Sequence, residues 1–281
     1  MSSTRVLITG AGGQLGQAMA AGWPDADVVP VTRHDLDVTS RRDVDAMVAG
    51  VRPTIVINCA AYTNVDGAED EPETAFAVNA WAPGLIAKAA TAAGAVFVHF
   101  STDFVFDGEH TEPYTEEDRP NPRSAYAASK LLGEWLAAEH GRSYVLRVES
   151  LFGGPRASSS VDRMLAALRS GAPVRAFVDR SVSPSYVQDV VRSTVALIAH
   201  DAPFGVYHCV NSGWTDWSTL AREVAKLAGI TGATIEDVRL ADAGLRASRP
   251  RFAALSNAKL ARAGVVLPTW QDALARYIAG T

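Results

Sequence analysis

Long hydrophobic runs and blocks of basic residues are both missing from this sequence of 281 residues. No stretch of about 18 apolar residues occurs, so no membrane-spanning helix is expected. Lysine and arginine never form a block longer than two, and the net charge is −5, so neither nucleic acid nor a membrane surface is an expected partner. The opening MSSTRVLITG passes directly into a strand-like pattern without a signal-peptide core. These absences favour a cytoplasmic protein.

Cysteine is scarce, which argues against a disulfide framework. The two cysteines, Cys59 and Cys209, lie in apolar strand-like runs, as small buried residues do. The histidines are scattered without a metal-ligand spacing, and helix ends, surface or packed strand positions explain them more simply; they include His99, His110, His140, His200 and His208. The sequence therefore predicts no metal site built from cysteine or histidine.

What the sequence does contain is a regular alternation of strand-like and helix-like segments. Its first half has apolar runs, and helical patterns separate them; the runs lie at 5–10, 26–32, 53–61, 95–102 and 143–150. The runs are almost continuously apolar, as expected when helices cover both faces of a parallel sheet. The predicted fold class is therefore α/β, a Rossmann-type doubly wound parallel sheet.

A glycine-rich loop follows the first strand. The stretch TGAGGQLG (9–16) fits G-x-x-G-x-x-G at Gly10, Gly13 and Gly16, and also a G-x-G start at Gly10 and Gly12. Backbone amides and a helix N-terminus can approach a pyrophosphate closely only where no Cβ intervenes. Because the loop stands between a strand and a helix, it predicts dinucleotide binding.

The tip of the second strand bears on the choice of dinucleotide. A carboxylate there favours the 2′-hydroxyl of NAD, and an arginine favours the 2′-phosphate of NADP. Arg33 directly follows this strand, with Asp35, Asp37 and Val38 close behind, so the sequence favours NADP(H) over NAD(H). A merely solvated Arg33 is the alternative. The third strand ends in a further segment where cofactor contacts are expected, namely Ala60, Ala61, Tyr62 and Thr63.

The second half of the chain is less regular and predicts a smaller lobe. We expect an NAD(P)-binding Rossmann domain over residues 1–152 and a mostly substrate-binding lobe over 153–281. Elements within 174–212 are expected to return to the main sheet, because GVYHCV is typical of a further strand.

Three side chains have the chemistry of carbonyl reduction. Thr102 ends the fourth strand, at the carboxyl edge where such sheets bind ligands. Tyr126 and Lys130, in SAYAASK, are four residues apart and share one helix face. Lys130 is expected to lower the pKa of Tyr126, which would protonate a carbonyl oxygen that Thr102 polarises. Taken alone, the Tyr126–Lys130 pair has a solvated surface pair as its alternative.

The glycine loop, the ST strand end and the YxxxK helix together resemble the extended short-chain dehydrogenase/reductase family. Within it, GGQLG, CAAYTNVDGAEDEPE, STDFVFDG and LPTWQDAL are similar to the dTDP-4-dehydrorhamnose reductases of deoxysugar biosynthesis. The resemblance covers most of the chain and implies reduction of a nucleoside-diphosphate 4-keto-6-deoxyhexose. It implies cofactor contacts at Gly13, Gln14, Leu15, Asp37, Val38, Ala61, Tyr62, Thr63, Tyr126 and Lys130.

The same resemblance implies nucleotide-sugar contacts at Val65, Asp103 and the strand end near Leu151. Two departures from the family pattern lie beside these positions. Phe104 stands where the family has tyrosine, and RVESL (147–151) places Glu149 and Leu151 where the family has R-T-S-W. Neither departure touches Thr102, Tyr126 or Lys130, so the reaction class holds while the identity of the sugar stays open.

Two further stretches allow a functional and a plain interpretation. In VDRSVSPSY (178–186), Arg180 and Ser183 either contact a sugar or diphosphate or belong to a polar loop. The acidic GAEDEPE (67–73) either complements a helix dipole or, as in some members of the resembled family, holds Mg²⁺ at a dimer interface. The chain is expected to act as a monomer or a homodimer.

The sequence as a whole predicts an NAD(P)H-dependent nucleotide-sugar 4-ketoreductase with Tyr126 as proton donor. One alternative is an epimerase or dehydratase on the same fold, and Phe104 directly after Asp103 disfavours the dehydratase. The other alternative is a non-catalytic NADP-binding regulatory subunit, which the intact Thr102, Tyr126 and Lys130 disfavour.

Overall fold

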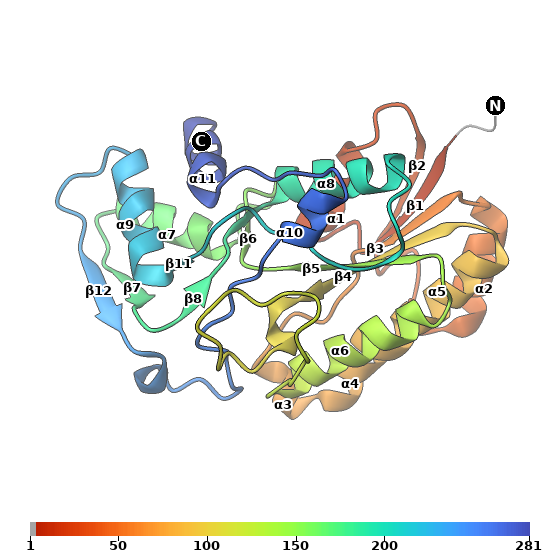
Figure 1. Ribbon diagram of the computed structural model, residues 1–281, viewed down its shortest axis with the longest axis horizontal. Coiled ribbons are helices and arrows are strands. Elements are labelled where there is room, and N and C mark those ends of the chain that lie inside the picture. Colours follow the sequence, from red (N-terminus) through yellow and green to blue (C-terminus); the bar gives the residue numbers. More distant parts are fainter. Residues whose placement is uncertain (1–3) are drawn as a thin grey trace.

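A six-stranded parallel sheet forms the centre of the computed structural model, which describes residues 4–281 (Figure 1). The spatial order is β2–β1–β3–β4–β5–β10, with bounds Arg5–Thr9 (β1), Asp27–Val31 (β2), Ile55–Asn58 (β3), Val96–Thr102 (β4), Ser143–Val148 (β5) and Gly205–His208 (β10). The strand order reverses between β1 and β3, which is where doubly wound sheets bind ligands. The predicted fold class is confirmed, and β10 returns from the second half of the chain to pair with β5.

Helices cover both faces of this sheet (Figure 1). One face packs against α1 (Gln14–Ala21), α8 (Val187–Ala199) and α10 (Ala258–Arg262), and the other against α2 (Arg41–Val51), α5 (Ala82–Ala92) and α6 (Ala125–Ala138). Successive strand residues point to opposite faces, so each strand must be apolar throughout. Among the described residues, no helix is both long and apolar enough to cross a membrane.

The helical segment between β3 and β4 is broken into several short pieces. It divides into α3 (Gly67–Asp70), α4 (Pro72–Phe76), a π-helical turn (η1, Ala77–Trp81) and α5. Within the π turn, the side chain of Asn79 exchanges two hydrogen bonds with the backbone of Tyr62 and donates a third to Ser129. Pairing with such distant partners leaves no local signal in the sequence, and π turns of this kind are frequent at functional sites.

A second hydrophobic core lies in the smaller lobe and is made only of residues between Phe152 and Ile278. Its helices are α7 (Ser160–Arg169), α9 (Trp217–Leu227) and α11 (Trp270–Ala279), and short strand pairs join them. The pairs are β6 (Leu151–Phe152) with β9 (Ser185–Tyr186), β7 (Val174–Phe177) with β12 (Ile235–Val238), and β8 (Ser181–Val182) with β11 (Thr215–Asp216); short 3₁₀ turns occupy Asp103–Val105 (η2) and Leu240–Ala243 (η3). The predicted domain boundaries stay a prediction.

A buried ion pair fixes helix α6 to the sheet. Arg147 on β5 donates two hydrogen bonds to the carboxylate of Glu134 on α6, at 2.9 and 2.7 Å. Both side chains are almost inaccessible to solvent, and the guanidinium also lies 5.0 Å from the ring centroid of Phe106. A bidentate pair fixes orientation as well as distance, so it sets the rotation of α6 against the sheet.

Breaking this pair is expected to destabilise the fold strongly. Glu134→Ala leaves the buried guanidinium of Arg147 without its carboxylate, which lowers the free energy of unfolding by about 3–5 kcal/mol in comparable cases. Urea denaturation followed by circular dichroism measures the change. The exposed Glu139, at the end of the same helix, gives the control variant Glu139→Ala, for which we expect a change within about 0.5 kcal/mol. Equal stability of the two variants would contradict the role of the pair.

Candidate active site

A cleft of about 910 Å³ opens where the sheet order reverses. Its walls include the glycine loop, the tip of β2 and the segment after β3. Gly10 has a φ of +68°, and a Cβ added there would lie 2.4 Å from the backbone nitrogen of Ala60. A Cβ on Gly16 would lie 2.3 Å from the carbonyl oxygen of Gly10. Only glycine fits these positions, which permit the tight turn after β1 and the close packing of the loop that dinucleotide-binding loops share.

Most of the residues predicted to contact the cofactor line this cleft, namely Gly10, Gly13, Arg33, Asp37, Val38, Ala60, Ala61 and Tyr62. Five predicted residues do not line it, and two of them, Tyr126 and Lys130, belong to the catalytic group described below. Gln14 lies under Gly154, Leu15 packs against the hydrophobic core, and Thr63 is exposed nearby. One carboxylate oxygen of Asp37 accepts hydrogen bonds from both the backbone nitrogen and the hydroxyl of Thr39. Asp37 is therefore already bonded within the chain.

Arg156 is a cleft residue that sequence reasoning missed. It lies in the loop after β6, and its Nη1 donates a hydrogen bond to the carbonyl oxygen of Gly12 at 2.8 Å. The two residues are 144 positions apart, so no local sequence pattern indicates the contact. With Arg33, it gives the cleft two cations, which suits a phosphate-bearing ligand.

The three predicted catalytic residues come together at the carboxyl end of β4. Ser124 caps helix α6 by accepting a hydrogen bond from the backbone nitrogen of Ala127, which places Tyr126 in the first turn and Lys130 one turn later. Tyr126 interacts with the Thr102 hydroxyl, and its ring meets Phe104 edge-on at 5.5 Å. The phenol and the Thr102 hydroxyl therefore lie together at the end of β4, and the ammonium of Lys130 lies further back along this strand, at the carbonyl oxygen of Phe100.

The electrostatics of Tyr126 differ from the expectation. Burial raises the pKa of its phenol, with Asp103 adding to the rise, while the hydrogen bond with Thr102 opposes it. The expected lowering by Lys130 is wrong for this arrangement, because the Lys130 ammonium turns to donate a hydrogen bond to the carbonyl oxygen of Phe100 at 2.6 Å. Burial lowers the pKa of Lys130 to about 8, against the opposite influences of Glu134 and Cys59.

Several predicted substrate residues gather around Tyr126. Val65 and Phe104 pack in one small hydrophobic cluster with it, and Asp103 accepts a hydrogen bond from Thr102 at 2.8 Å. Ser183 is fully buried and donates its backbone N–H to Glu149 at 2.7 Å. Leu151 instead packs against the main hydrophobic core. Glu149 was noted in the sequence only as a departure from the family pattern, yet it lies among these residues.

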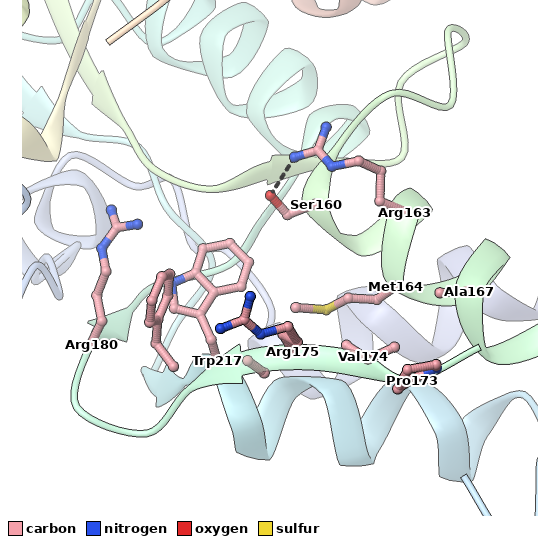
Figure 2. A pocket seen from close by; sticks show the side chains of 11 residues that line it. Ser160, Arg163, Met164, Ala167, Pro173, Val174, Arg175, Arg180 and Trp217 are labelled. Carbon is pink, nitrogen blue, oxygen red and sulfur yellow. Dashed lines mark hydrogen bonds between the residues drawn. The ribbon is translucent and has the colours of Figure 1, made fainter. Parts of the chain in front are cut away.

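A second cavity of about 340 Å³ lies in the smaller lobe, between α7, β7 and α9. Figure 2 shows Arg163, Arg175 and Arg180 around it, with Trp217 between Arg175 and Arg180. Arg180 also reaches toward the first site, because its guanidinium carbon lies 5.3 Å from the ring centroid of Phe104. In a protein of net negative charge, three arginines and an indole around one cavity favour an anionic ligand with an aromatic part.

The acidic stretch at 67–73 is used for contacts within the chain. Glu69 accepts a hydrogen bond from the backbone nitrogen of Ala125, at the start of α6, and Asp70 pairs with Arg246. Across the described residues, no group of three or more histidine, cysteine, aspartate or glutamate side chains is arranged to hold a metal ion. The acidic stretch therefore positions α6 and the segment around Arg246.

Comparison with known proteins gives consistent results over the whole chain. Residues 4–281 match the family described as RmlD substrate binding domain. The spore coat polysaccharide biosynthesis protein SpsK of Bacillus subtilis is 33% identical over 280 residues, which cover 98% of this chain and 97% of that protein. The dTDP-4-dehydrorhamnose reductase of Streptomyces griseus is 35% identical over 281 residues, which cover 96% of this chain and 91% of that protein.

The fold comparison agrees with this result. The crystal structure of dTDP-4-dehydrorhamnose reductase from Bacillus anthracis in complex with NADP has a TM-score of 0.95 and 32% sequence identity, covering 99% of this chain and 100% of that one. The chain therefore belongs to the RmlD substrate-binding domain family and is a homologue of the dTDP-4-dehydrorhamnose reductases, which are NAD(P)-dependent oxidoreductases.

Proposed function

We propose that this protein uses NADPH to reduce the 4-keto group of a nucleoside-diphosphate 4-keto-6-deoxyhexose. The observation that carries the proposal is the contact of Tyr126 with Thr102, one helical turn from Lys130 and next to the cleft at the glycine loop. When bound, the cofactor supplies hydride to the carbonyl carbon. The chain acts as a monomer or homodimer, and its smaller lobe, within residues 153–281, binds the nucleotide part of the substrate.

Tyr126, Thr102 and Lys130 have different roles in proton transfer and charge stabilisation. Tyr126 gives its phenolic proton to the carbonyl oxygen, and its raised pKa keeps that proton in place at neutral pH. Thr102 polarises the same oxygen. Lys130 leaves the carbonyl oxygen of Phe100 to hold the nicotinamide ribose, and its positive charge then favours the tyrosinate that forms.

The substrate extends from Tyr126 into the arginine-rich cavity. Phe104 contacts both Tyr126 and Arg180, so the ketone at Tyr126 and the diphosphate at Arg180 both lie near this ring. Arg163, Arg175 and Arg180 then face the diphosphate and the nucleoside, and Trp217 offers an aromatic face to the base.

Loss of the tyrosine hydroxyl provides the direct test of the activity. With dTDP-4-keto-6-deoxyglucose and NADPH, the wild-type protein should oxidise the cofactor. The loss of absorbance in the nicotinamide band of NADPH measures the rate. Tyr126→Phe keeps the ring against Phe104 and removes the proton donor, so the rate should fall by a factor of about 10²–10⁴. NADPH binding without oxidation, for wild type and variant alike, would favour a regulatory subunit. NAD that stays bound through purification would favour an epimerase.

The alkaline limit of activity should follow Lys130 and not Tyr126. The pKa of Lys130 is lowered to about 8 and that of Tyr126 is raised, so the lysine loses its charge first as the pH rises. We expect kcat/KM to fall above about pH 8. In Lys130→Arg the charge persists, so the fall should shift to higher pH even if the maximal rate is reduced. An unchanged alkaline limit would contradict this assignment.

Arg33 should set the preference for NADPH over NADH. It lines the cleft at the tip of β2, where it can meet a 2′-phosphate. Arg33→Ser should raise the Kd of NADPH by about tenfold, the loss of one charge-assisted hydrogen bond, and leave the Kd of NADH within about twofold. Fluorescence titration measures both. Arg41→Ser is the control, because Arg41 is exposed and pairs with Asp45 outside the cleft. Equal losses for both cofactors would refute the assignment.

A further inference from the structure

Buried polar atoms without hydrogen-bond partners gather beside the catalytic residues. Among the described residues, seven buried side-chain nitrogen or oxygen atoms have no partner. Three of these are Asp103 Oδ2, Glu149 Oε1 and Arg180 Nε, whose charges act on one another. A fourth is Trp217 Nε1, in a ring whose centroid lies 5.9 Å from the Arg180 guanidinium. Folded proteins pair nearly all buried polar atoms, so such a gathering indicates a polar ligand.

The two carboxyl groups are each anchored by one oxygen only. Glu149 Oε2 accepts the backbone N–H of Ser183 at 2.7 Å, and Asp103 Oδ1 accepts the hydroxyl of Thr102 at 2.8 Å. Glu149 is 2% exposed and Asp103 is 3% exposed, so water does not satisfy the remaining oxygens freely. No ion pair within the described chain joins either carboxyl group to Arg180. Each carboxyl group therefore has one oxygen that no group of the described chain satisfies.

The unpartnered atoms indicate which hydrogen-bonding groups a ligand at this place needs. Asp103 Oδ2 is an acceptor and needs a hydroxyl or amine donor. Burial raises the pKa of Glu149 and its Oε2 accepts from Ser183, so Glu149 Oε1 carries the proton and is a donor. Arg180 Nε–H and Trp217 Nε1–H are donors as well and need acceptors. A hexose has hydroxyl groups, which both donate and accept hydrogen bonds, and the phosphate linked to its anomeric carbon has acceptors. A sugar phosphate thus matches both halves of the cluster, in the order that the contacts Tyr126–Phe104–Arg180–Trp217 define.

We propose that Glu149 determines specificity by donating a hydrogen bond to the C3 hydroxyl of the hexose, which itself donates to Asp103, while Arg180 and Trp217 donate to the sugar-linked phosphate. The inference rests on the proposed function, in which Thr102 polarises the C4 oxygen. Asp103 follows Thr102 directly and is bonded to its hydroxyl. Of the two carbons next to C4 in a 6-deoxyhexose, only C3 has a hydroxyl, because C5 has the methyl group and the ring oxygen.

The burial of Glu149 carries a stability penalty that a purely structural residue would not explain. Burial, with Asp103 adding to it, holds the pKa of Glu149 well above its ordinary value. Above that ordinary value, the unfolded chain releases this proton while the folded protein retains it, so the free energy of unfolding falls as the pH rises through the window between the two pKa values. Glu149→Gln removes this dependence and can still accept the N–H of Ser183.

Calorimetric binding of three ligands tests the inference: dTDP, dTDP-6-deoxyglucose and its 3-deoxy analogue. Glu149→Met removes the hydrogen-bond donor, so it should raise the Kd of dTDP-6-deoxyglucose by about five- to tenfold, as for the loss of a neutral hydrogen bond. The Kd values of dTDP and of the 3-deoxy analogue should stay within about twofold. Glu139→Met, on the surface at the end of α6, is the control and should change none of them.

The possible outcomes separate the inference from the proposed function. Equal weakening of all three ligands, or no change in any, would overturn the role of Glu149. If wild-type protein binds dTDP yet does not distinguish the two sugars, the C3 assignment is wrong and the nucleotide site stands. If wild type does not bind dTDP, the proposed function fails, and this inference fails with it. As a second readout, Glu149→Gln should raise the Tm, and by more at pH 8 than at pH 5; a lower Tm at pH 8 would favour a structural role.

Discussion

The position of helix α6 against the sheet is the constraint on which the catalytic geometry depends. Three contacts on two successive turns fix it: Glu134 pairs with Arg147 on β5, Lys130 donates to the carbonyl oxygen of Phe100 on β4, and Ser129 accepts from Asn79 in the π turn. Contacts to three different elements fix both the rotation and the height of a helix. Tyr126, one turn closer to its start, is thereby held against the end of β4, where Thr102 lies.

The distribution of charge follows from the same arrangement. The protein has a net charge of −5, yet arginines line two separate cavities. Arg33 and Arg156 lie at the cleft, and Arg163, Arg175 and Arg180 lie at the cavity of the smaller lobe. A reductase of a nucleotide sugar must hold two polyphosphates with their reactive ends together. Two separate cationic sites meet that requirement, whereas a single basic patch would not.

The sequence predicted those features whose causes are local. The apolar runs of the main sheet, the glycine loop and the Tyr126–Lys130 spacing all depend on neighbouring residues, and the fold class follows from them. The π turn at Ala77–Trp81 and the contact of Arg156 with Gly12 depend on partners far along the chain, so no periodicity could indicate them. The charge relation of Lys130 to Tyr126 was wrong for a similar reason, because helical spacing fixes where a lysine starts but not where its flexible chain ends.

Arg147 and Glu149 are both buried ionisable residues, but one is satisfied within the fold and the other is not. The two residues stand two positions apart at the end of β5, and both are buried and ionisable. Arg147 has a complete set of partners in Glu134 and His208, and a buried charge so satisfied is sufficiently explained by the fold. Glu149 has one oxygen bonded and one without a partner, although Arg180 is near enough to act on its charge. A fold that needed only stability would close that contact, so the open oxygen is better explained by a ligand that completes it.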